Sequence, residues 1–169
     1  MRRKTLSVKI GKVFIGSDHS IKTQSMTTAS TMDTDKSVDE AIRIIQAGGK
    51  LVRFTAPNIN EAKNLLNIKN ALVAKGYDDP LVADIHFTPN AALEASKIVE
   101  KVRINPGNYV DKKKFEVKEY DDKSYQDELL KIEEKFIPLI NSCKENKVAR
   151  RIGTNPVSYT HLRAHETAV

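Results

Sequence analysis

The sequence has few of the residues that define several large classes of protein. Among its 169 residues there is one cysteine, there is no tryptophan, and glycine and proline number only 7 and 6. The single cysteine, Cys143, excludes a disulfide framework, and alone it cannot hold a zinc ion or an iron–sulfur cluster. Because 40% of the residues are hydrophobic, we expect a chain that folds around a core rather than a collagen-like or disordered one.

Long apolar segments are also missing. No run approaches the roughly 18 consecutive apolar residues that a membrane-spanning helix needs. The basic start, residues 1–4, leads into alternating valine, isoleucine and lysine rather than into the apolar core of a signal peptide. We therefore expect a soluble, cytoplasmic protein with no membrane partner.

The charge balance is mildly basic. The chain has 28 basic and 22 acidic residues, a formal net charge of +6 and an isoelectric point near 9.3. The basic residues do not gather into a stripe with interleaved aromatic residues, so we expect a solvated basic surface and no nucleic-acid partner. A small anionic ligand remains compatible with this charge.

Short apolar segments alternate with amphipathic ones along most of the chain. Residues 6–15 alternate in polarity around Gly11 and Lys12, which predicts an N-terminal β-hairpin. Five further strands are predicted, with helical periodicity between them. The predicted strands are residues 21–26, 50–55, 80–87, 101–105 and 149–153.

Capping residues indicate where the predicted helices begin. Ser37 with Glu40 three residues later forms a capping box, and Asn58 with Glu61 caps a second helix. A longer helix is predicted from about Ser124. Its predicted apolar face consists of Leu129, Ile132, Phe136 and Ile140.

Strands separated by helices predict a parallel sheet with crossover connections. An open doubly wound sheet and a (β/α)₈ barrel both satisfy this pattern. A complete barrel takes about 250 residues, whereas only five such strands are predicted here. The pattern therefore predicts an α/β fold and leaves both architectures open.

Each predicted strand ends in polar or charged residues. In parallel α/β folds the carboxyl ends of the strands gather on one face, where ligands bind. Arg53, Arg103 and Arg151 come from three such ends, and guanidinium groups bind phosphate oxygens in a bidentate manner. The pattern favours an anion site over three arginines that are solvated or paired with carboxylates.

Asp84 and His86 lie two residues apart on a predicted strand, so their side chains share a face. Such a pair suits proton transfer or the orientation of a substrate hydroxyl, and a buried polar pair within a barrel is the alternative. Asn105 and Asn108 flank a Pro-Gly turn and can donate hydrogen bonds to a ligand.

Five segments at these strand ends are distinctive. They are QSMTT (24–28), VRFTAP (52–57), PLVADIHF (80–87), EKVRINPGN (100–108) and RIGTN (151–155). Together, and in this order, they resemble the 4-hydroxy-3-methylbut-2-enyl diphosphate synthase family, also called GcpE or IspG. The resemblance covers about residues 3–155. The charged span 110–147 resembles the longer, three-domain form found in plants and some bacteria.

The resemblance implies that residues 1–155 are the N-terminal part of a TIM barrel, with about five of its eight strands after a β-hairpin. In the family this barrel binds the diphosphate of 2-C-methyl-D-erythritol 2,4-cyclodiphosphate, on the methylerythritol phosphate route to isoprenoids. In the family a C-terminal domain holds a [4Fe–4S] cluster. Two electrons from ferredoxin or flavodoxin open the ring and remove a hydroxyl. The resemblance assigns no catalytic residue and no metal ligand to this chain. The substrate-binding residues that it implies are Arg53, Asp84, His86, Arg103, Asn105, Asn108, Arg151 and Asn155.

Two features depart from the family pattern. Nothing matches the cluster-binding cysteines, so we expect that the C-terminal iron–sulfur domain is absent, that Cys143 is an ordinary helix cysteine and that the chain alone is inactive. Residues 156–169 lack the family's continuation and resemble sequencing-adapter read-through, so we expect a non-native tail. His161 and His165 within it have the spacing of zinc ligands but lack a third ligand.

Two other functions stay open at this point. Another phosphate-binding barrel enzyme, of the dihydropteroate synthase-like group, would also place its substrate at the strand ends. A half-barrel that binds anions without catalysis is the second alternative.

Overall fold

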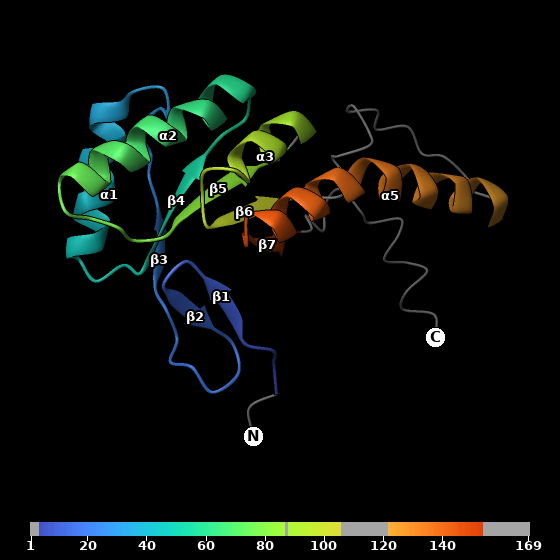
Figure 1. The fold of residues 1–169 in the computed structure, drawn as a ribbon, viewed down its shortest axis with the longest axis horizontal. Helices are drawn as coiled ribbons and strands as arrows, with labels where there is room; N and C mark the ends of the chain where they lie inside the picture. Colours follow the sequence, from blue (N-terminus) through green and yellow to red (C-terminus); the bar gives the residue numbers. More distant parts are fainter. Residues whose placement is uncertain (1–3, 87, 106–121, 154–169) are drawn as a thin grey trace.

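A parallel sheet with helices on one face forms most of the structure (Figure 1). The computed structural model describes residues 4–86, 88–105 and 122–153. Neighbouring strands follow the order of the sequence, β3-β4-β5-β6-β7, and each pair is parallel. A doubly wound sheet reverses its strand order at one point, whereas a barrel does not. The strands are β3 (Gln24–Met26), β4 (Leu51–Thr55), β5 (Leu81–Ile85), β6 (Lys101–Ile104) and β7 (Ala149–Ile152).

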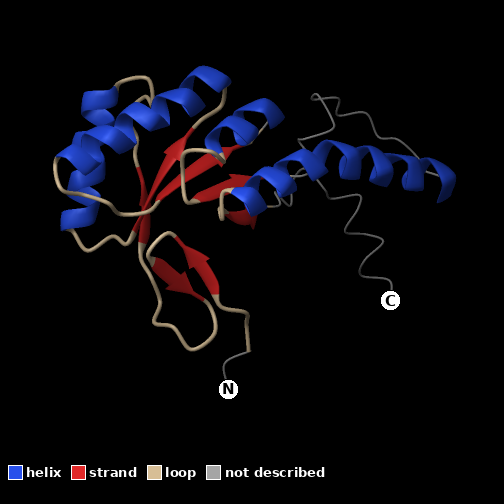
Figure 2. Cartoon of the chain, viewed as in Figure 1, coloured by secondary structure: helices blue, strands red, loops and turns tan. Residues whose placement is uncertain are grey.

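The helices between these strands cover the same face of the sheet (Figure 2). Consecutive parallel strands with helices on one face are the arrangement found in a segment of a (β/α)₈ barrel. The helices of the described part are α1 (Thr34–Gln46), α2 (Ile59–Ala74), α3 (Pro89–Ala95) and α5 (Asp122–Glu145). Among the described residues, no helix is long and apolar enough to cross a membrane.

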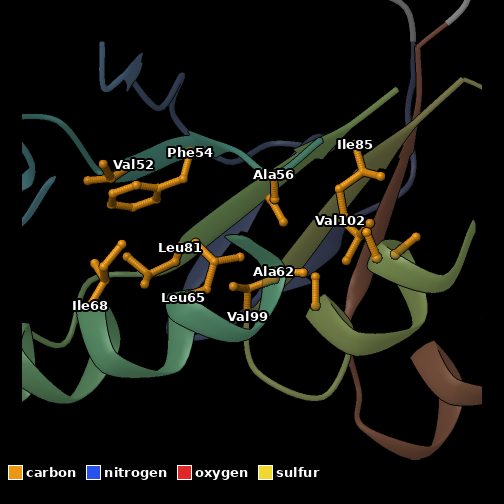
Figure 3. Close-up of a cluster of buried hydrophobic side chains, with 14 of the residues drawn as sticks. Val52, Phe54, Ala56, Ala62, Leu65, Ile68, Leu81, Ile85, Val99 and Val102 are labelled. Atoms are coloured by element: carbon orange, nitrogen blue, oxygen red, sulfur yellow. The ribbon is translucent and has the colours of Figure 1, made fainter. Parts of the chain in front are cut away.

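The main core lies between the sheet and the helices. Successive side chains of a strand point to opposite faces, so every second residue of β4, β5 and β6 faces the helices. Phe54 of β4 and Leu65 of α2 are completely buried there, and Figure 3 shows them within the cluster. The strand residues of this cluster include Val52, Phe54, Leu81, Ile85, Val102 and Ile104.

A β-hairpin covers part of the other face of the sheet, as Figure 1 shows. It consists of β1 (Val8–Ile10) and β2 (Val13–Ile15), which pair in antiparallel fashion around Gly11, as predicted. Ile10 is completely buried in a second, small apolar cluster with Leu51 and Val82. These two residues lie near the amino ends of β4 and β5. The hairpin therefore closes that end of the sheet and leaves the carboxyl ends of the strands to polar residues.

The capping box predicted at Ser37 and Glu40 is wrong. Helix α1 begins at Thr34, and its N-cap is Asp33, whose side chain accepts a hydrogen bond from the backbone N–H of Lys36. Ser37 is buried inside the helix, where its hydroxyl donates to the carbonyl of Ser30. Because Ser37 has this partner and Glu40 binds elsewhere, neither is available as a cap.

The cap at Asn58 is confirmed. Its side chain accepts a hydrogen bond from the backbone N–H of Glu61, 3.1 Å away, at the start of α2.

The apolar face predicted for the last helix is partly wrong. Leu129 is 41% exposed, whereas Leu139 and Cys143, which that prediction omitted, are buried in the main core. Figure 1 shows why: only the C-terminal part of α5 lies against the rest of the fold. Helical periodicity indicates which residues share a face, but not how far along the helix that face has something to pack against.

Candidate anion-binding site

The predicted site residues that lie on described strands are on the face of the sheet away from the helices, which we call the inner face. Phe54, Ile85 and Ile104 face the helices. Because side chains alternate along a strand, the residue next to each of them in its strand lies on the inner face. Three of the predicted site residues are neighbours in register across adjacent strands: Asp84 of β5 lies beside Arg103 of β6, which lies beside Arg151 of β7.

Asp84 holds two of the arginines in place. Its Oδ1 accepts a hydrogen bond from Nη1 of Arg103 at 2.8 Å, and its Oδ2 lies 3.3 Å from Nε of Arg53. The carboxylate is only 4% exposed, which is tolerated because both of its oxygens face a guanidinium group. One negative charge is thus shared between two positive charges, and the cluster keeps a net positive charge.

His86 completes the arrangement at the carboxyl end of β5. Its Nδ1 lies 3.6 Å from Oδ1 of Asp84, and its ring also contacts Nη1 of Arg103. The structure therefore brings together four of the residues that the sequence singled out. That the Asp84–His86 pair transfers a proton or orients a substrate hydroxyl stays a prediction.

The remaining predicted residues divide into two groups. Arg151 is exposed beside Arg103, and no carboxylate among the described residues forms an ion pair with it. Asn105 is completely buried just after β6. Asn108, Asn155 and the tail 156–169 with its two histidines lie outside the described residues.

Gly153 is a residue of the site that sequence reasoning missed. A Cβ atom built on it would lie 2.9 Å from Nη2 of Arg103 and closer still to Nε. The backbone of Gly153 also donates a hydrogen bond to the carbonyl of Ile104, at 2.8 Å. The guanidinium group of Arg103 therefore lies against the backbone of the glycine that follows the next strand, in space that any other side chain would occupy.

Lys101 is the second residue that was missed. It is on the inner face, two residues before Arg103 on β6, and it is only 7% exposed. Burial lowers the pKa of its ammonium group, and the positive charges of Arg151 and Arg53 lower it further. The signal in the sequence was its spacing of two from Arg103, which places both side chains on one face.

The loop that follows β3 is anchored by Glu40 of α1. The carboxylate of Glu40 accepts hydrogen bonds from the backbone N–H groups of Thr28, at 2.6 Å, and Ala29, at 3.0 Å. These donors lower the pKa of Glu40 below its ordinary value. On the other side, the hydroxyl of Thr31 donates to the carbonyl of Thr55 at the end of β4. The loop is thus held at the carboxyl end of the sheet.

Replacing Glu40 by glutamine should loosen this loop. The neutral amide loses the charge-assisted part of the two bonds, about 1.5 kcal/mol, which is roughly tenfold in the opening equilibrium. Hydrogen exchange at the Thr28 and Ala29 amides should be about ten times faster. The bonds need the carboxylate, so they are present at neutral pH and lost as the pH falls through the lowered pKa of Glu40.

Asp39→Asn is the matched control, because Asp39 is the neighbouring carboxylate on α1, is 70% exposed and faces Lys75 instead. Equal exchange rates in Glu40→Gln and the native chain would show that Glu40 does not hold the loop.

The residues present do not fit an iron–sulfur cluster. Such clusters are held by several cysteine thiolates, and the only cysteine, Cys143, is 2% exposed within the main core. Burial raises the pKa of its thiol, which opposes the thiolate form. In the described part of the chain, no group of three or more histidine, cysteine or acidic residues is arranged to hold a metal ion.

Comparisons with known proteins agree with the arrangement of the strands. The family model described as the GcpE TIM-barrel domain matches residues 5–167. A protein from Chlamydia abortus is 53% identical over 155 residues, which are 91% of this chain and 26% of that protein. A protein from Akkermansia muciniphila is 52% identical over 154 residues, again 91% of this chain and 26% of the relative. Both are named 4-hydroxy-3-methylbut-2-en-1-yl diphosphate synthase (flavodoxin). The chain thus spans about a quarter of the length of these curated relatives.

Proposed function

The chain belongs to the GcpE TIM-barrel family, and from that premise we propose that it is the diphosphate-binding part of a 4-hydroxy-3-methylbut-2-en-1-yl diphosphate synthase. The family match is as predicted from the strand-end segments, and it decides against the dihydropteroate synthase-like alternative. The substrate that we propose is 2-C-methyl-D-erythritol 2,4-cyclodiphosphate, in the biosynthesis of isoprenoids in the cytoplasm.

One observation carries the proposal: Asp84 orients two guanidinium groups at the carboxyl ends of the strands. Arg53 and Arg103 are 25% and 16% exposed, so both are partly buried yet open to a ligand. Arg151 lies beside Arg103 with its charge uncompensated among the described residues. Three guanidinium groups and one carboxylate favour a ligand with at least two negative charges, such as a diphosphate.

Orientation by Asp84 also suits the reaction. When the cyclic diphosphate opens, one bond between carbon and a phosphate oxygen breaks, and negative charge develops on that oxygen. Arg53 and Arg103 already face the inner side of the sheet, so they can stabilise this charge without reorganising. Asn105, Asn108 and Asn155 would act as further polar partners of the substrate. His86, beside Arg103, would orient a hydroxyl of the substrate or exchange a proton with it.

The redox step belongs to another part of the protein in this proposal. The residues of this chain do not fit the cluster, so we assign no electron transfer to them. We propose that residues 1–155 act within a longer protein whose further segments hold a [4Fe–4S] cluster, and that residues 156–169 are a non-native tail. The names of the relatives support flavodoxin as the electron donor, and ferredoxin is the other donor that the family resemblance implies.

A chimera tests the proposed function. Residues 1–155 of this chain replace the matching segment of the Akkermansia muciniphila relative, with which the chain shares 52% identity. We expect the purified chimera, with its cluster reconstituted and a strong reductant supplied, to convert the cyclodiphosphate to 4-hydroxy-3-methylbut-2-enyl diphosphate. A folded chimera with an intact cluster that neither binds nor converts the cyclodiphosphate would contradict the proposal.

A further inference from the structure

Lys101 is a buried cation with no anionic partner among the described residues. Only 7% of the residue is exposed, and no hydrogen bond or ion pair joins its ammonium group to any other described residue. Lysine is almost never buried to this extent without a partner, because removing an ammonium group from water is unfavourable. Such a group is stable when a ligand supplies the missing negative charge.

The position of Lys101 in the sheet shows where that ligand would lie. In register Lys101 lies between Val82 of β5 and Ala149 of β7, two members of the small apolar cluster beneath the hairpin. A lysine in such a place buries its aliphatic stem and extends its ammonium group toward the more polar region. Here that region contains Arg53 and Arg151, whose charges act on the ammonium group.

We propose that Lys101 is a further cationic ligand of the diphosphate. It lies on the inner face, closer to the amino ends of the strands than the arginines, and binds the phosphate oxygens that reach farthest in that direction. This role rests on the proposed function. It adds to that function because it assigns a ligand at the inner end of the site, whereas Asp84, Arg53 and Arg103 lie at the end open to the ligand.

The charges around Lys101 explain why an anion is needed. One carboxylate, Asp84, already faces two guanidinium groups, so it cannot also neutralise the lysine. The hairpin packed beneath contributes the apolar residues Ile10 and Ile15. The titratable and charged groups on the same face of the surrounding strands are Arg53 of β4, Asp84 of β5, Arg103 of β6 and Arg151 of β7, together with His86 just after β5.

Proton uptake gives the proposal a direct signature. The pKa of Lys101 is lowered in the free protein, and an anion against the ammonium group would raise it. Between these two pKa values the free protein holds the proton only in part, whereas the complex holds it fully. Binding should therefore take up protons, and affinity should fall as the pH rises through this interval.

The test titrates inorganic pyrophosphate by calorimetry into the full 169-residue chain and, in parallel, into the chimera. Titrations run from about pH 7 to 10, around the ordinary range of lysine, in pairs of buffers with different ionisation enthalpies. Lys101→Met should bind about ten times more weakly and take up fewer protons than the native sequence. Lys101→Arg should keep most of the affinity, because the charge remains, but should lose the extra proton uptake.

Lys63→Met is the matched control, since it removes the same charge from an exposed position on α2, and it should behave as the native sequence. Replacing Lys101 by methionine relieves repulsion between cations, so we expect the variant to fold, and circular dichroism checks this.

If the chain or the chimera binds pyrophosphate and its Lys101→Met variant keeps the unmutated affinity or proton uptake, the inference is overturned. The proposed function would still stand. If neither the chain nor the chimera binds pyrophosphate without a substitution, both the inference and the proposed diphosphate site are overturned.

Discussion

Arg103→Ala in the chimera should weaken binding of the cyclodiphosphate roughly ten- to hundredfold. A charge-assisted hydrogen bond contributes about 1.5–3 kcal/mol, and each factor of ten in affinity corresponds to about 1.4 kcal/mol. The loss has two sources, because Arg103 contacts the ligand in our proposal and also neutralises Asp84, whose Oδ1 lies 2.8 Å away. Without Arg103, the nearly buried carboxylate has only Arg53 as an oriented partner and repels the incoming anion.

Calorimetric titration of the cyclodiphosphate measures this effect. Arg150→Ala is the matched control, because Arg150 pairs in register with Val102, which faces the helices. It thus removes the same side chain from the opposite face of the sheet and should leave affinity unchanged. An Arg103→Ala chimera that keeps its fold and its native affinity would remove Arg103 from the site.

The 169-residue chain on its own should show no turnover and should associate in solution. The proposed reaction requires electrons from a cluster, and one cysteine cannot supply the thiolates that such a cluster needs. In the described sheet, β3 and β7 are edge strands. Unpaired strand edges promote association between chains, and the side chain of Ile152 on β7 is 60% exposed.

Three measurements test this expectation. Circular dichroism should show helix, a dye for apolar surfaces should bind, and elution from a sizing column should be broad or oligomeric. After iron reconstitution, with a strong reductant and the cyclodiphosphate, product should not exceed the blank without protein. The chimera serves as the active control. Turnover by the chain, or a sharp monomer that unfolds cooperatively, would show that the chain contains more of the enzyme than we infer.

The alternation of strands and helices could be predicted because it depends on local patterns. Each predicted strand of the sheet is present, although β3 begins at Gln24 rather than at residue 21. The cap at Asn58 was also predictable, because a cap involves only residues a few positions apart. The capping box at Ser37 failed because the partners of Ser37 and Glu40 lie in the loop before the helix.

The site could be predicted in part for the same reason. Three arginines at strand ends indicated where charge gathers, but the sequence could not show that Asp84 bridges Arg53 and Arg103. Lys101 and Gly153 were missed because their significance depends on contacts between strands. A lysine at the start of a strand is usually exposed, and the need for glycine at 153 comes from a side chain 50 residues earlier.

The opposite chemistry of the two faces of β4, β5 and β6 also limits how the sheet can assemble. A shift of one residue in pairing turns every side chain of a strand to the other face. In β6 such a slip would place Arg103 beneath the helices and would turn Val102 and Ile104 to the inner face. A misregistered sheet would therefore lose its core and the proposed binding site together. The charged residues of the proposed site thus also favour the correct register of the strands during folding.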